Sequence, residues 1–156
     1  MTFAVVRVRG TVNVRGSISD TLKMLRLNKA NHCVLIPESE AYKGMLQKVK
    51  DYVTWGEIDD KTLELLVKKR ARVAGGGQLD GDYIKRNSGH KDVESFIKKL
   101  ASGESKIKSV KGLKPVFRLK PPTKGFERAG IKKSYSVGGA LGYRGDKINE
   151  LLARMI

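Results

Sequence analysis

The chain has 156 residues, of which 40% are hydrophobic, and its 32 lysines and arginines outnumber 16 acidic residues, for a formal net charge of +16. This length suffices to bury a core as one domain, or as one domain with an elaboration. So basic a chain attracts nucleic acid, an anionic membrane face or a strongly acidic protein, and we expect nucleic acid. No run of about 18 apolar residues and no signal-type apolar core is present, so we expect a soluble, cytoplasmic protein with no membrane partner.

The positive charge is concentrated in the second part of the chain. Residues 1–60 carry 9 basic against 7 acidic residues, whereas residues 61–156 carry 23 against 9. Between residues 105 and 135, ten lysines and arginines accompany a single acid, Glu127. A segment that repels itself this strongly is expected to bind a polyanion.

The hydrophobic pattern of the first sixty residues predicts alternating strands and helices. The predicted elements are strands at residues 3–9, 33–36 and 53–58, a helix at residues 20–28 and a helix at residues 38–50. The first strand should have faces of different polarity, and Ser19 and Asp20 should cap a helix whose Leu22, Met24 and Leu25 face inward. This order is half of a ferredoxin-like plan, in which both helices cover one side of the sheet and the other side remains available.

Gly44 lies inside the second predicted helix. A glycine there costs about 1 kcal/mol relative to alanine. We therefore expect that either a packed neighbour or an outside molecule needs the space at this position.

The second part of the chain is predicted to consist of shorter pieces. They are a helix from the caps Asp59 and Asp60 to Val67, a polar stretch around Tyr83, a helix at residues 93–100, a strand at residues 116–119, a Gly-rich cationic loop at residues 120–144 and a helix at residues 148–155 capped by Asp146. The cations after Val67 suit the end of a helix. The tract at residues 118–133 should have no fixed shape alone and should become ordered along RNA.

Residues for catalysis or metal binding are few. Cys33 is the only cysteine; we expect a buried thiol, with a reactive nucleophile as the lesser alternative. His32 and His90 are the only histidines, and Asp80 and Asp82 are expected to form a polar turn. The glycines lack P-loop spacing, and the run at residues 138–145 is either a flexible loop or a close approach to phosphate. We expect no catalytic residues, metal, cofactor or small-molecule substrate.

Four blocks of the sequence carry a family resemblance. They are VRVRG at residues 6–10, TLKMLRLNKANHCVLIPESEAYKGMLQKVKDYVTWGE at residues 21–57, RLKPP at residues 118–122 and GGALGYRGDKINELLARMI at residues 138–156. Together they resemble the ribosomal protein L-thirty family of the large subunit in its archaeal long form, which is related to eukaryotic L-seven. The short bacterial form is similar only to residues 1 to about 60.

The resemblance implies an α+β fold, with a ferredoxin-like β-α-β-α-β core at residues 1–59 and an added C-terminal α/β subdomain at residues 60–156 that contains the long basic loop. It implies a non-enzymatic, structural role in the large ribosomal subunit that supports assembly and translation. The implied partners are large-subunit rRNA of the 23S type, near 5S rRNA, and neighbouring ribosomal proteins, with the chain a monomer within the ribosome.

The resemblance also implies a set of RNA-binding residues. These are Arg7, Arg9, Arg15, Arg26, Lys29, Asn31, His32, Lys43, Gly44, Arg118, Lys120 and Arg144. Their charge alone adds Lys124, Arg128, Lys132 and Lys133.

Two other functions remain open from the sequence. A free RNA chaperone or general nucleic-acid-binding protein would need only the same charge. An RNA-processing enzyme would have to use Cys33, His32 or the pair Asp80 and Asp82, which do not make a complete set of acid, base and nucleophile.

Overall fold

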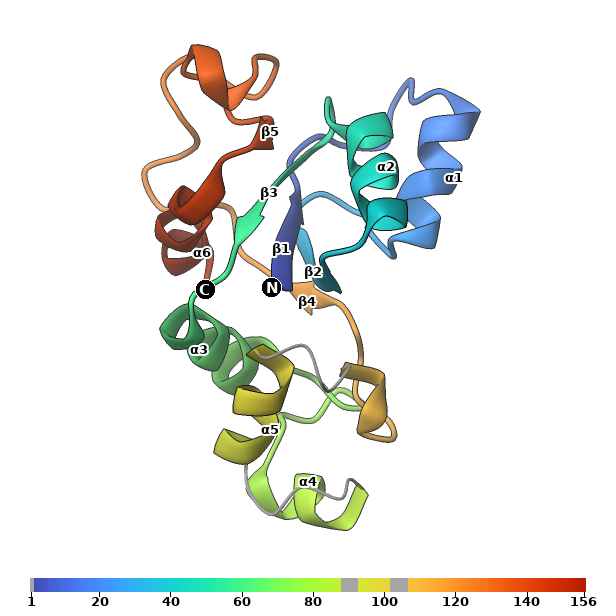
Figure 1. Ribbon diagram of the computed structural model, residues 1–156, viewed down its shortest axis with the longest axis vertical. Coiled ribbons are helices and arrows are strands. Elements are labelled where there is room, and N and C mark those ends of the chain that lie inside the picture. Colours follow the sequence, from blue (N-terminus) through green and yellow to red (C-terminus); the bar gives the residue numbers. More distant parts are fainter. Residues whose placement is uncertain (1, 88–92, 102–106) are drawn as a thin grey trace.

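A computed structural model describes residues 2–87, 93–101 and 107–156 as a mixed α+β fold (Figure 1). The strands are β1 (Thr2–Arg7), β2 (His32–Pro37), β3 (Val53–Glu57), β4 (Phe117–Arg118) and β5 (Gly142–Tyr143). The helices are α1 (Gly16–Met24), α2 (Glu40–Val49), α3 (Asp60–Arg70), α4 (Gly81–Asn87), α5 (Val93–Ala101) and α6 (Ile148–Met155). Short 3-10 turns are η1 (Ile107–Ser109), η2 (Tyr135–Val137) and η3 (Gly145–Lys147).

The described strands form one sheet in the order β4-β2-β1-β3-β5. Central β1 is antiparallel to both neighbours, and Val5 lies opposite Val34 on one side and Trp55 on the other. At the edges, β4 pairs antiparallel with β2 and β5 pairs parallel with β3. Strands from residues 60–156 therefore complete a sheet that residues 1–59 begin.

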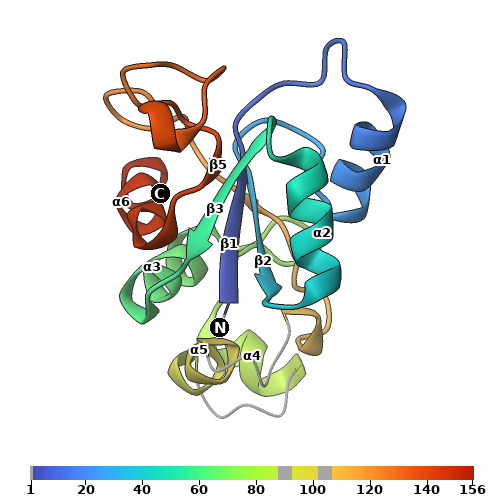
Figure 2. The ribbon, with the colours of Figure 1, turned by 45° about the horizontal axis from the view of Figure 1, so that its top comes forward.

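Both faces of the sheet are covered, as Figure 2 shows. Val5 packs with Leu22 of α1 and Leu46 of α2 on one face. Ala4 packs on the other face, with Leu66 of α3 and residues of α5 and α6. The expectation that one face remains available was wrong, because the helices of the second part bury it. The expected polarity difference along β1 was wrong for the same reason, since its residues from Phe3 onward are buried.

The N-terminal helix differs from its expectation. It begins at Gly16, before Ser19 and Asp20, and its first turn has no side-chain cap. Leu22 and Leu25 are buried as expected, but Met24 is 69% exposed. In contrast, Ser39 caps α2 by accepting a hydrogen bond from a backbone amide in the first turn.

The side chain of Asn149 fixes the N-terminal ends of both α3 and α6. Neither helix has the aspartate side-chain cap that the sequence predicted. Instead, Asn149 accepts from the Asp59 amide at 3.0 Å through Oδ1 and donates from Nδ2 to the oxygens of Glu57 and Asp146. Because buried polar groups need partners, these bonds position α6 against the turn between β3 and α3.

Helix α4 was not predicted. The residues around Tyr83 form this helix, and the Asp80 oxygen accepts from the amides of Tyr83 and Ile84 at its start. Asp82 thus lies in the first turn of α4, and the expected polar turn was wrong. The 7-residue element buries only Ile84, too short a pattern for helical periodicity to register.

Candidate nucleic-acid interface

Arg7 lies inside the chain and fixes two loops. It is 3% exposed, and its Nη1 donates to the Leu27 oxygen at 2.6 Å. Its Nε and Nη2 donate to the oxygens of Arg9 and Gly10 at 2.8 and 2.7 Å. Burial lowers the pKa of Arg7, but a guanidinium in a protein stays protonated. Arg7 therefore joins the segment after β1 to the segment after α1.

The turn between α1 and β2 is exposed, cationic and conformationally fixed. Arg26 and Asn31 both have left-handed backbones, with φ of 61° and 63°. The Asn31 amide donates to the Arg7 oxygen at 2.8 Å, and its oxygen accepts from the Leu119 amide at 3.0 Å. Arg26 and Lys29 are exposed on this turn. Left-handed non-glycine residues persist where their surroundings hold them, often at binding sites.

His32 and Arg118 connect this turn to the second part of the chain. The two residues are partners in the β2–β4 pairing. Burial lowers the pKa of His32, and the charges of Arg118 and Lys29 lower it further. Among the described residues, the buried Nδ1 of His32 has no hydrogen-bond partner. Arg26, Lys29, His32 and Arg118 together are called the turn cluster below.

Two further arginines flank this region. The Arg9 guanidinium lies 4.9 Å from the ring centre of Tyr52 and donates to the Asp51 oxygen at 3.2 Å. Arg15 is exposed immediately before α1. Arg9 is thus held against the start of β3, whereas Arg15 extends from the loop that precedes a helix.

Lys43 and Gly44 lie on the exposed face of α2. Lys43 pairs with Glu38 at 2.9 Å and with Glu40 at 3.7 Å. At Gly44, an added Cβ would meet no atom within 4 Å. A packed neighbour in the described part of the chain therefore does not explain this glycine, which leaves an outside molecule as the alternative.

The loop at residues 120–144 closes on itself. The Ala129 amide donates to the Gly138 oxygen at 3.1 Å, and a Cβ at Gly139 would lie only 2.1 Å from the Lys133 oxygen. The expectation of a tract without fixed shape was wrong, because these contacts order it within the chain. Its exposed cations are Lys120, Lys124, Arg128, Lys132 and Lys133.

Arg144 is used inside this loop. Its Nη1 and Nη2 donate to the Glu127 carboxylate at 2.7 and 3.2 Å, and its Nε donates to Thr54 Oγ1 at 2.8 Å. The guanidinium also lies 4.7 Å from the ring centre of Tyr135. Burial raises the pKa of Glu127, but the hydrogen bonds from Arg144 and the nearby charge of Arg154 give a net lowering. Like Arg7, Arg144 uses its guanidinium group for contacts within the folded chain.

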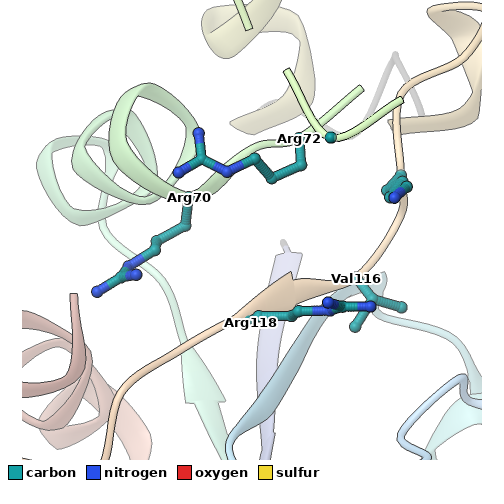
Figure 3. A pocket seen from close by; sticks show the side chains of 6 residues that line it. Arg70, Arg72, Val116 and Arg118 are labelled. Atoms are coloured by element: carbon teal, nitrogen blue, oxygen red, sulfur yellow. The ribbon is translucent and has the colours of Figure 1, made fainter. Parts of the chain in front are cut away.

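A basic cavity of about 220 Å³ lies between the end of α3 and β4 (Figure 3). It is lined by Arg70, Arg72, Gly76, Lys114, Val116 and Arg118. Only Arg118 was among the predicted site residues. Arg70 and Arg72 resemble ordinary cations at a helix end, and only the folded chain brings them near Lys114. The one sequence feature that could have pointed to this cavity was the position of Lys114, just before the predicted strand at residues 116–119.

The groups considered for catalysis do not form a reactive set among the described residues. Cys33 is buried, and burial raises the pKa of its thiol to about 12, so the alternative of a reactive nucleophile was wrong. Residues 2–87, 93–101 and 107–156 contain no group of three histidine, cysteine or acidic side chains that could hold a metal. His90 lies outside the described residues.

Within the described part of the chain, no helix has the length and apolarity to cross a membrane.

Comparisons with known proteins identify the family of the chain. The profile of the family described as ribosomal protein L30p/L7e matches residues 3–53. Three relatives have the name large ribosomal subunit protein uL30: one from Methanococcus maripaludis strain C5 (56% identical over 100% of both chains), one from Methanococcus vannielii (54%, also 100% of both) and one from Nanoarchaeum equitans (50%, over 99% of this chain and 98% of its own).

The fold and its exposed cations define a basic α+β protein. Full-length identity of 50 to 56% to these archaeal relatives makes the assignment specific. The chain belongs to the uL30 family of large-subunit ribosomal proteins. This is a family of ribosomal proteins rather than of enzymes.

Proposed function

We propose that this chain is a structural constituent of the large ribosomal subunit in the cytoplasm. It binds 23S-type rRNA near 5S rRNA, contacts neighbouring ribosomal proteins as a monomer and supports assembly and translation. The observation that supports this most is the turn cluster, in which three cations from distant parts of the sequence lie on one surface beside His32. Convergent, exposed cations with so few acids among them suit a phosphate backbone.

The proposed RNA surface is smaller than the predicted residue set. Arg7 and Arg144 are excluded because their guanidinium groups are buried and fully engaged within the chain. The retained residues are Arg9, Arg15, Arg26, Lys29, Asn31, His32, Lys43, Gly44, Arg118, Lys120, Lys124, Arg128, Lys132 and Lys133. Lysine and arginine contacts to phosphate position a protein without reading bases, so RNA shape would determine recognition.

The two segments of the chain have different shares in this function. Residues 1–59 supply the ordered turn between α1 and β2, and residues 60–156 supply β4 and the closed basic loop. The second segment thus extends the RNA surface of the first. The division into a core at residues 1–59 and an extension at residues 60–156 is part of this proposal. The strands of the two segments belong to one sheet.

Sedimentation of cell extract through sucrose gradients tests the function. The tagged chain, produced in Methanococcus maripaludis, should migrate with large subunits at moderate salt and dissociate only at high salt, because counterion release makes phosphate contacts salt-dependent. Recovery with the free proteins at moderate salt would contradict the proposal. Equal affinity of the purified chain for duplex DNA and for large-subunit rRNA would instead indicate a general nucleic-acid-binding protein.

A further inference from the structure

The basic cavity beside β4 brings together cations from two segments of the chain. Arg70 ends α3, Arg72 follows it, and Lys114 and Arg118 belong to the segment that enters and forms β4 (Figure 3). Among the described residues that line the cavity, none is acidic. The helix dipole favours cations at the end of α3. It does not explain Lys114 or Arg118, which come from elsewhere in the chain.

The backbone fixes the positions of these cations. The Lys114 amide donates to the Arg72 oxygen at 2.9 Å, and Arg72 forms an isolated bridge with Gln78. Arg118 is fixed by its pairing with His32. The like charges therefore stay near one another because of main-chain bonds, although their repulsion opposes this arrangement.

Opposite charge within the described chain does not offset this repulsion. Among the ion pairs of residues 2–87, 93–101 and 107–156, none involves Arg72, Lys114 or Arg118. Arg70 donates from Nη2 to the Ile156 oxygen, and its buried Nε has no hydrogen-bond partner among the described residues. Arg70 is therefore held within the chain, whereas Arg72, Lys114 and Arg118 are left without a counter-charge in the described part of the chain.

We propose that this cavity binds one phosphate group of the RNA backbone. Arg72, Lys114 and Arg118 supply the positive charge. Through Arg118 and His32 the cavity is continuous with the turn cluster, so a single RNA strand can contact both. This inference rests on the proposed RNA-binding function and adds Arg72 and Lys114 to its surface.

Charge-neutralising double variants test the cavity. The double variant Arg72→Gln and Lys114→Gln should bind large-subunit rRNA of Methanococcus maripaludis about tenfold more weakly, and the slope of log affinity against log salt should fall by about 1. The matched control is Lys61→Gln with Lys98→Gln, which removes the same charge from exposed positions on α3 and α5. The control should bind rRNA with nearly the affinity of the unmodified chain. Both double variants should have the same thermal unfolding midpoint as the unmodified chain.

Three results would overturn the inference. If the cavity variant binds rRNA as tightly as the control, RNA does not use the cavity, while the proposed function stands. If the unmodified chain prefers rRNA no more than duplex DNA, the proposed function fails and the cavity assignment fails with it. If inorganic phosphate binds the unmodified chain saturably in calorimetry while the cavity variant retains full rRNA affinity, the cavity serves a free anion instead.

Discussion

Glu127, the single acid between residues 105 and 135, is held by Arg144 through hydrogen bonds of 2.7 and 3.2 Å. Glu127→Gln should destabilise the protein by about 2 kcal/mol or more, because it leaves the buried guanidinium of Arg144 without its counter-charge. Urea unfolding at neutral pH measures the effect. Glu150→Gln is the control, since it breaks only the exposed pair with Lys147 and should leave stability unchanged. Equal stability of the two variants would contradict the structural role of Glu127.

The same ion pair predicts a pH dependence. The pKa of Glu127 is lowered in the folded protein from its usual 4.5. A lowered carboxyl pKa gives stability that is fully present above the unfolded pKa and is lost as the pH falls through the folded pKa. The difference in unfolding free energy between the unmodified chain and Glu127→Gln should therefore be constant from pH 7 to about 5 and shrink below the unfolded value. A difference that grows on acidification would refute this sign.

Gly56→Ala should be strongly destabilising. A Cβ at Gly56 would lie 2.0 Å from the Gly145 oxygen, so η3 would have to move away from β3. Overpacking of this kind costs about 1–3 kcal/mol or more. Thermal unfolding measures the loss. Gly10→Ala, at an open position with no atom within 4 Å, should change the midpoint little, and a similar loss in both variants would argue against the contact.

Gly44→Ala should separate stability from binding. The free protein should gain up to about 1 kcal/mol, since alanine favours a helix interior and the position is open. If RNA approaches α2 closely at this point, affinity for large-subunit rRNA should nevertheless fall. Chemical unfolding and filter binding on the same preparation report the two effects. Unchanged RNA affinity would remove Gly44 from the proposed surface.

The basic residues of the predicted set should divide into two groups, one that binds RNA and one that stabilises the fold. Arg26→Gln with Lys29→Gln should weaken rRNA binding and leave the unfolding free energy almost unchanged, because both side chains are exposed. Arg7→Gln should instead destabilise the protein, because it removes hydrogen bonds to three backbone oxygens. Parallel binding and unfolding measurements would contradict this division if Arg7→Gln weakened binding at full stability.

The sequence predicted elements well where one repeating pattern was strong. The positions of α2 and α6 followed from their apolar periodicity, and β1 from its alternation. The environment of β1 did not follow, because the second covering layer comes from helices more than fifty residues later. Short α4 gave too little periodicity to be recognised.

The candidate site was predictable in kind but not in detail. Charge and motif indicate cations, yet Arg26 and Arg144 look alike in sequence, and only the folded chain exposes one and buries the other. The basic cavity depends on main-chain pairing between Arg72 and Lys114, which are distant in sequence. No local pattern carries information on such pairing.

The sheet order has a consequence for synthesis of the chain. Strand β3 acquires its outer neighbour only when residues 142–143 are available, since Thr54 pairs with Gly142. The edge of β2 stays open until residues 117–118 are made, and the edge of β3 stays open until residues 142–143 are made; open edges are templates for pairing with other chains. The two-residue strands β4 and β5 close these edges late and present little edge of their own. The newly made protein therefore presents two open edges before residues 117–118 are made and keeps one at β3 until the last strand is added, so contact with RNA or a chaperone would protect it during this period.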